Sequence, residues 1–151
     1  MVEAQSDVTL PVPPREAFAA ISDLEHADWL PAVRGLRHVG GPRKGVGARY
    51  EVEVGAMGRH LRGVLVCEEL TPPKRMVMAL DGGLELTIEA AVRAVRGGCR
   101  VDISARYSVG SGLLAAALER SSQGAARREV ARACEQLAAR FGRKDRVGSA
   151  G

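Results

Sequence analysis

Alternating apolar and polar residues recur in successive segments between Val33 and Val109, and no other feature constrains the fold as much. The clearest segments are GVGARYEVEVG, LELTIEAAVRAV and CRVDISARYSV. Such alternation is typical of strands with one face buried and one face in water. Turn signals at Gly40-Gly41-Pro42, Asp81-Gly82-Gly83 and Gly97-Gly98 leave no room for crossover helices between the segments. The sequence therefore predicts an antiparallel meander of six strands.

The apolar side of each predicted strand is expected to face the interior. Its members are Val46, Ala48, Tyr50, Val52 and Val54, then Leu84, Leu86, Ile88, Ala90 and Val92, then Val101, Ile103, Ala105, Tyr107 and Val109. The segment RHLRGVLVCEEL, residues 59–70, allows two orientations. Either Val64 and Val66 point inward and share their face with His60, Arg62 and Glu68, or Leu61, Leu65 and Cys67 point inward.

Other elements flank this meander. SDVTLPV, residues 6–12, predicts a first strand, and Pro14 is well placed to open a helix over PREAFAAISD. A second short helix is predicted over LEHADWL and ends at Pro31. A helix of about 45 Å is predicted from Ser111 to Phe141. The middle of that helix, RSSQGAA, has small, weakly polar side chains where large core residues are expected.

Composition limits the class of protein. The 151 residues, 46% hydrophobic and 26% charged, fit one globular domain. No apolar run approaches the ~20 residues of a membrane span, and the start of the chain has no signal-peptide pattern. The cysteines Cys67, Cys99 and Cys134 form no CxxC pair, which favours reduced thiols and a cytoplasmic location.

The net charge of +4 raises the question of nucleic-acid binding, but only 3% of the residues are aromatic. Binding of single strands relies on aromatic side chains that stack on bases, so the sequence argues against this class. The three histidines His26, His38 and His60 are not clustered, and no HExxH motif occurs. We therefore expect neither a metal nor a cofactor.

The order of elements, together with several weak motifs, resembles a known family. The motifs are VPPREAFAAISDLEHADWLPAV, KGVGARYEV, VCEELTPPKRMVM and GGCRVDISARYSV. They are similar to segments of the START/Bet v1-like superfamily and, within it, of the polyketide cyclase/dehydrase-like (SRPBCC) proteins. The resemblance implies one α+β helix-grip domain over residues 1–144, with a curved antiparallel sheet wrapped around the long C-terminal helix, and a flexible tail over residues 145–151.

That fold would place an internal cavity between sheet and helix. An apolar cavity favours an apolar or aromatic ligand that a few hydroxyls orient. Trp29 would stand at the rim, with the alternative that it simply fills the core. The residues expected to contact a ligand are Trp29, Val52, Leu86, Ile88, Ile103, Leu118 and Ser122. The candidate proton-transfer groups are Tyr50 and Tyr107 inside, with His60 and Arg62 at the mouth.

The resemblance implies two classes of function. The first is a cofactor-independent cyclase, aromatase or dehydratase of polyketide-type secondary metabolism, and the second is a carrier or sequestering protein for a lipid, quinone or antibiotic. Basic residues between Arg120 and Arg146 outnumber acidic ones and would suit an acidic acyl-carrier protein. A solvated helix face is the alternative reading of these charges. The expected assembly is a monomer or a homodimer.

Overall fold

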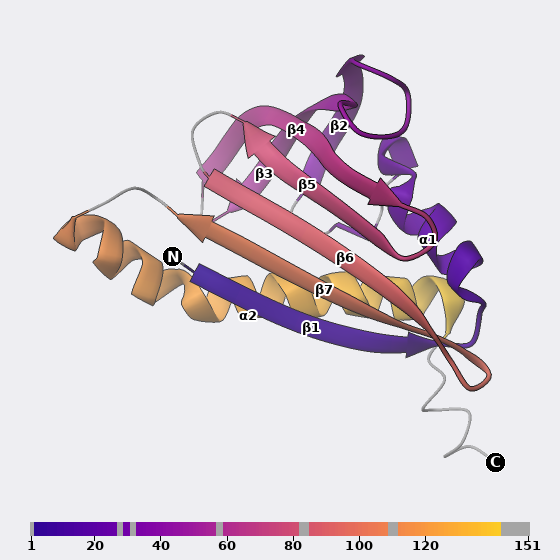
Figure 1. The fold of residues 1–151 in the computed structure, drawn as a ribbon. Coiled ribbons are helices and arrows are strands. Elements are labelled where there is room, and N and C mark those ends of the chain that lie inside the picture. Colours follow the sequence, from indigo (N-terminus) through magenta and orange to yellow (C-terminus); the bar gives the residue numbers. More distant parts are fainter. Residues whose placement is uncertain are drawn as a thin grey trace.

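A curved sheet forms the centre of the protein, which we describe from a computed structural model covering residues 2–26, 29–30, 33–56, 59–81, 85–108 and 112–142 (Figure 1). The strands run in the order β1-β7-β6-β5-β4-β3-β2, and every neighbouring pair is antiparallel. Their bounds are β1 (Val2–Leu10), β2 (Val33–Gly40), β3 (Arg49–Ala56), β4 (Arg59–Thr71), β5 (Arg75–Asp81), β6 (Glu85–Val95) and β7 (Gly98–Ser108). The predicted six-strand meander is confirmed as β2 to β7, with β1 added beside β7.

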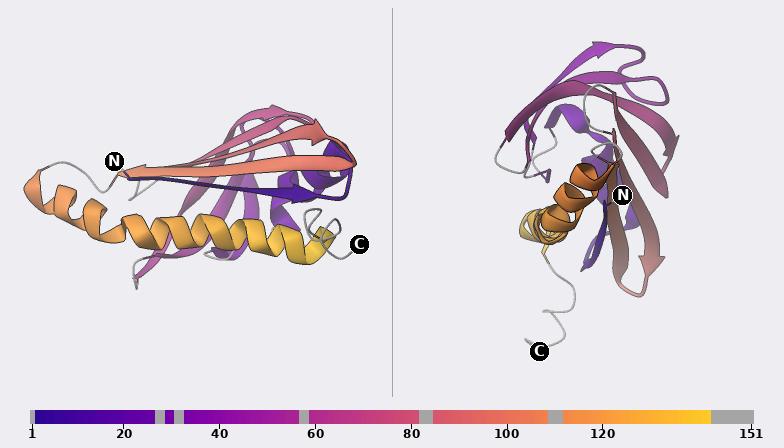
Figure 2. Two further views of the ribbon diagram at one scale, coloured as in Figure 1. Left: turned by 90° about the horizontal axis from the view of Figure 1, so that it is seen from below. Right: turned by 90° about the vertical axis from the view of Figure 1, so that its left-hand side faces the viewer.

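Three helical elements accompany the sheet. The helix α1 (Pro14–Ser22) and the short 3-10 helix η1 (Leu24–His26) lie between β1 and β2 in the chain, and α2 (Leu113–Phe141) follows β7. Figure 2 shows that α2 runs along one side of the curled sheet. It packs mainly against β1 and β7. This arrangement is the helix-grip fold that the family resemblance implied.

Several predicted boundaries were wrong. β1 begins at Val2 rather than at residue 6, because Val2 and Ala4 continue the buried alternation of Val8 and Leu10. The predicted second helix is reduced to η1, and residues 27–28 lie outside the described part of the chain. Val46 is exposed rather than inward-facing, because it stands in the turn before β3.

The register of the strands settles the orientation of residues 59–70. Leu65 and Cys67 are buried, and they pair with the buried Leu80 and Met78 of β5. Val64 and Val66 therefore point to the outer face. The second of the two predicted orientations is correct.

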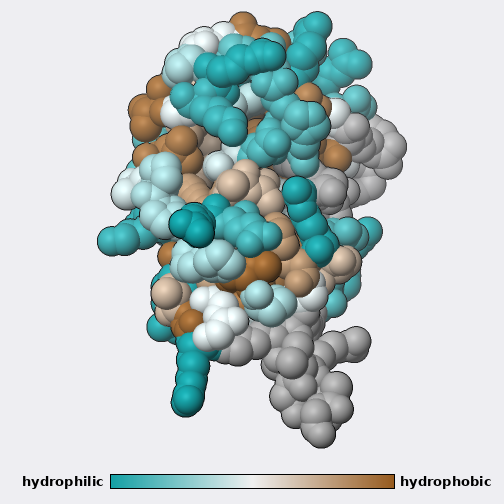
Figure 3. Space-filling model, turned by 90° about the vertical axis from the view of Figure 1, so that its right-hand side faces the viewer, coloured by the Kyte–Doolittle hydropathy of each residue, from teal (hydrophilic) through white to brown (hydrophobic). Residues whose placement is uncertain are grey.

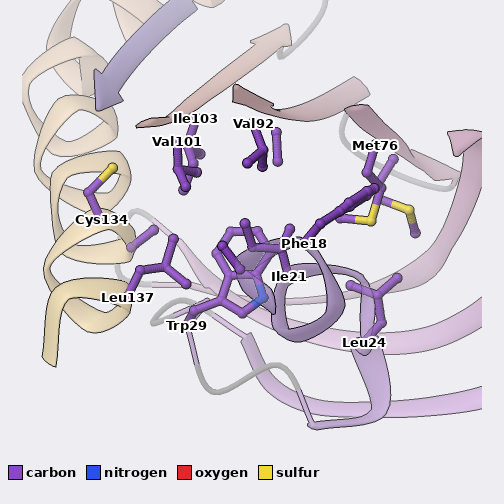
Figure 4. Packing of buried hydrophobic residues seen from close by; sticks show 14 of the residues in the cluster. Phe18, Ile21, Leu24, Trp29, Met76, Val92, Val101, Ile103, Cys134 and Leu137 are labelled. Atoms are coloured by element: carbon purple, nitrogen blue, oxygen red, sulfur yellow. The ribbon is translucent and has the colours of Figure 1, made fainter. Parts of the chain in front are cut away.

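The two faces of the sheet differ in chemistry. Cross-strand ion pairs stabilise the outer face, among them Arg100–Asp7 at 2.7 Å and Arg75–Glu89 at 3.0 Å. One end of the molecule, seen in Figure 3, is largely hydrophilic with small apolar areas between the charged groups. The inner face instead carries the apolar core shown in Figure 4, with side chains from α1, the sheet and α2.

Candidate ligand-binding site

The two inward-facing tyrosines stand in one row across the sheet. Tyr107 on β7 pairs with Leu86, Leu86 with Leu80, Leu80 with Leu65, and Leu65 with Tyr50 on β3. Four strand spacings separate the two tyrosines, about 19 Å along the sheet. A strip of three leucines thus connects two phenols on the inner face.

Part of the inner face near Tyr107 is open to solvent. Leu86, Ile88 and Ala105 are only partly buried, although register places them on the same face as the buried Ile103 and Met78. Inner residues of the rows toward the turn between β6 and β7, such as Val92 and Val101, are buried. Apolar side chains that face the interior yet keep solvent contact can accept an apolar ligand.

Tyr107 supplies the polar group beside this open surface. Its side chain is 8% exposed, and its hydroxyl donates to Ser122 Oγ of α2 at 2.6 Å. The carbonyl oxygen of Ser122 lies 3.4 Å from the same hydroxyl. Ser122 Oγ donates in turn to the carbonyl oxygen of Glu119 at 3.1 Å. This buried chain of hydrogen bonds connects the sheet to the middle of α2. The predicted contact of Ser122 with a ligand stays a prediction.

Glu119 is a buried residue that the sequence analysis missed. Only 9% of it is exposed, and it stands one turn before Ser122 on the inner side of α2. The buried positions of α2 recur at helical spacing, namely Glu119, Ser122, Val130, Ala133, Cys134 and Leu137. Extending that spacing backward from Leu137 in the sequence would have predicted that Glu119 lies on the buried side of the helix.

Tyr50 has a different environment at the other end of the row. Its hydroxyl donates to the carbonyl oxygen of Arg43 at 2.7 Å, and its ring meets His38 edge to face with 5.5 Å between centroids. Burial, and then the nearby Glu25 carboxylate, raise the pKa of the Tyr50 phenol. The phenol therefore keeps its proton beyond the pH at which an ordinary tyrosine ionises, and its hydrogen bond anchors it to the turn before β3.

Trp29 lies in the core rather than at a rim. It is 1% exposed and packs between α1, which carries Phe18 and Ile21, and Leu137 of α2 (Figure 4). Leu137 and Ser122 are about 22 Å apart along the helix. Trp29 and Tyr107 therefore belong to different ends of the interior. The indole Nε1 is buried without a hydrogen-bond partner in the described structure.

The remaining predicted site residues fall into three groups. Val52 and Ile103 face inward and are buried in the apolar core, and their contact with a ligand stays a prediction. Arg62 is exposed opposite Glu53 on the outer face, so its predicted place at a cavity mouth is wrong. The side chains of His60 and Leu118 lie outside the described part of the structure.

The thiols offer little reactive chemistry. All three cysteines are free and buried, and burial raises the pKa of Cys134 to about 11. Among the described residues, no group of three or more His, Cys, Asp or Glu side chains could hold a metal ion. No described helix is long and apolar enough to cross a membrane.

Comparison of the structure with solved structures identifies the class of fold. A START superfamily protein from Mycobacterium smegmatis superposes with a TM-score of 0.68 at 12% identity, over 89% of this chain and 98% of that one. TTHA0849 from Thermus thermophilus gives 0.78 at 20% identity, over 92% and 96%. The di-domain ARO/CYC protein BexL from the BE-7585A biosynthetic pathway gives 0.65 at 19% identity, over 89% of this chain and 46% of that one.

The sequence itself identifies the family. Residues 1–142 match the model of the polyketide cyclase/dehydrase and lipid transport family, so the chain belongs to that family. A search of curated protein sequences finds no match.

Proposed function

We propose that this protein binds a hydrophobic or polyaromatic small molecule between the sheet and α2, as a carrier or sequestering protein. The observation that carries the proposal is the partly exposed inner surface of Leu86, Ile88 and Ala105, with the Tyr107–Ser122 pair at its edge. Such a surface combines apolar contact with a small number of oriented polar groups, as ligand sites do. Family membership supports the same reading.

Filling the proposed site tests this function. Ala105→Leu adds bulk to the inner face, whereas Ala79→Leu adds the same bulk to the outer face of β5. We expect the inner substitution to weaken binding of the neutral fluorophore N-phenyl-1-naphthylamine about tenfold, a cost of about 1.4 kcal/mol. The outer substitution should leave binding unchanged. Equal effects of the two substitutions, or no binding by the parent protein, would contradict the proposal.

A catalytic role is the second candidate, and Glu119 is the observation that favours it. A buried carboxyl group one turn from Ser122, which bonds to the Tyr107 phenol, is a combination that can transfer protons during cyclisation or dehydration. The structural neighbour BexL is a di-domain ARO/CYC protein of a biosynthetic pathway, and this likeness supports such a role in secondary metabolism. Turnover of a poly-β-keto thioester that falls at least ~10²-fold in Glu119→Gln would establish it. Absence of turnover in the parent protein leaves the carrier.

A protein partner belongs to this proposal as well. Five arginines of α2 are exposed, namely Arg120, Arg127, Arg128, Arg132 and Arg140. Arg132 bonds to Glu129 at 3.2 Å within the helix. We propose this arginine face as the docking surface for an acidic acyl-carrier protein that would deliver a tethered chain. Association should weaken steeply between low and high salt, because the attraction is electrostatic. An affinity independent of salt would argue for the solvated-face alternative.

A further inference from the structure

The hydrogen-bond directions around Tyr107 restrict what kind of ligand group it can meet. A phenol has one hydrogen to donate, and its oxygen also accepts. The hydrogen of Tyr107 has two acceptors on Ser122, Oγ at 2.6 Å and the carbonyl oxygen at 3.4 Å. The phenol hydrogen is thus committed to the protein, and the phenol oxygen keeps its capacity to accept.

Ser122 is arranged to maintain that commitment. Its own hydrogen is donated to the carbonyl oxygen of Glu119 at 3.1 Å, so Oγ turns a lone pair toward Tyr107. Ser122 is only 4% exposed, which protects both hydrogen bonds from exchange with water.

The neighbours of the phenol on the sheet are apolar. Leu86 and Val2 are its direct neighbours on the two adjacent strands, and Leu86 is partly open to solvent. At the far end of the same row, the Tyr50 hydrogen is likewise donated to a backbone carbonyl. Neither phenol of the row therefore has an uncommitted hydrogen for a ligand carbonyl.

We propose that the ligand presents a hydroxyl group, as in a hydroxylated aromatic compound, and donates it to the Tyr107 oxygen. We further propose that Ser122 determines this preference by holding the Tyr107 hydrogen. The inference rests on the ligand-binding function proposed above and specifies the polarity of its ligand. A ligand whose only polar group is a carbonyl would meet an acceptor where it needs a donor.

Two naphthalene derivatives of similar size test the inference, 2-naphthol with a hydroxyl and 2-acetylnaphthalene with a ketone. Their dissociation constants are measured by calorimetry for the parent protein and for Ser122→Ala, Tyr107→Phe and Ser104→Ala. Ser104 lies on the outer face of the same strand as Tyr107, so Ser104→Ala is the matched control. Thermal unfolding checks that each variant is folded.

The expected pattern differs between the variants. Ser122→Ala removes the 2.6 Å acceptor and leaves the phenol hydrogen only the 3.4 Å contact with the backbone carbonyl oxygen, so a ligand ketone can compete for that hydrogen. The variant should tighten 2-acetylnaphthalene about fivefold while 2-naphthol changes little, since one net hydrogen bond is worth about that factor. Tyr107→Phe should weaken 2-naphthol about fivefold and leave the ketone unchanged. Ser104→Ala should match the parent protein for both compounds.

Three results would overturn the inference. If Ser122→Ala leaves the ratio of the two affinities at its parent value, Ser122 does not determine the preference. If Ser122→Ala does not fold, Tyr107→Phe replaces it, and an unchanged ratio in that variant contradicts the proposal. If the parent protein binds the ketone as tightly as 2-naphthol, the phenol does not select a donor, although ligand binding itself stands. If unsubstituted naphthalene and both derivatives all fail to bind, the ligand-binding function fails and the inference with it.

Discussion

The hydrogen bond between Tyr107 and Ser122 should be measurable as a coupling in stability. Tyr107→Phe removes the donor and leaves Ser122 still bonded to the Glu119 carbonyl oxygen. The expected cost in free energy of unfolding is about 1 kcal/mol. Ser122→Ala leaves a buried phenol with only the 3.4 Å contact, so its cost should be about 1–3 kcal/mol.

The double variant supplies the coupling energy. Once Ser122 is gone, removing the phenol hydroxyl costs less, so the two single effects should exceed the effect of the pair by about 1 kcal/mol. For a domain of this length, 1 kcal/mol corresponds to a shift in melting temperature of about 3 °C. Urea unfolding followed by fluorescence of Trp29 gives each value, because this single, buried tryptophan is retained in every variant.

A second cycle serves as the control. It combines Tyr50→Phe with Ser122→Ala, two residues that do not share a hydrogen bond. Tyr50 lies on β3, four strands away from β7, and donates to the Arg43 carbonyl oxygen. Their effects should add within about 0.3–0.5 kcal/mol. If the Tyr107–Ser122 cycle is additive within the same limits, the hydrogen bond contributes no net stability and our account of the site is wrong.

The sheet was predictable because its signal is local. Apolar and polar residues alternate along β3, β6 and β7, and the alternation by itself assigns each side chain to a face. The inward positions of Tyr50, Ile103 and Tyr107 followed without any knowledge of tertiary structure. Their buried state in the structure confirms the predicted faces.

The face of β4 could not be predicted from its own residues. Both Val64 with Val66 and Leu65 with Cys67 are apolar pairs, so periodicity favours neither orientation. Pairing with β3 decides, because Tyr50 must face the same way as its partner Leu65. Arg62 then points outward, whereas the sequence analysis wrongly placed it at a cavity mouth.

The polar contact inside the site depends on how α2 docks. Tyr107 and Ser122 come from different elements, and no periodicity within either element predicts that their oxygens lie 2.6 Å apart. The same docking buries Glu119, although its helical spacing from Val130 and Leu137 was readable in the sequence. The place of Trp29 stayed open between rim and core for a related reason, because packing between α1 and α2 decides where a side chain beside a turn lies, and the structure shows the core.

Three further substitutions test the described faces and burial. Gly63→Ala would bring a Cβ atom 2.9 Å from a leucine methyl group of β5 and should lower the free energy of unfolding in urea by about 1 kcal/mol or more. In Gly35→Ala the added Cβ atom meets nothing within 4 Å, so this control should be neutral. Equal losses in the two variants would contradict the β4–β5 packing. Burial raises the pKa of Cys134 to about 11 from an ordinary value of 9.0, so between these values the folded state keeps a proton that the unfolded chain releases. The stability that the protonated thiol contributes is therefore complete below pH 9 and is lost between pH 9 and 11. Cys134→Ala should therefore reduce the loss in free energy of unfolding over that range by up to about 2 kcal/mol, as measured by urea unfolding. If the free energies of variant and parent fall in parallel with pH, this prediction is refuted. Arg62→Ala should leave the affinity for 2-naphthol unchanged, because Arg62 is exposed on the outer face, which the leucine strip does not share. If Arg62→Ala weakens the affinity about fivefold, as expected for Tyr107→Phe, then the ligand contacts the outer face and the proposed site is wrong.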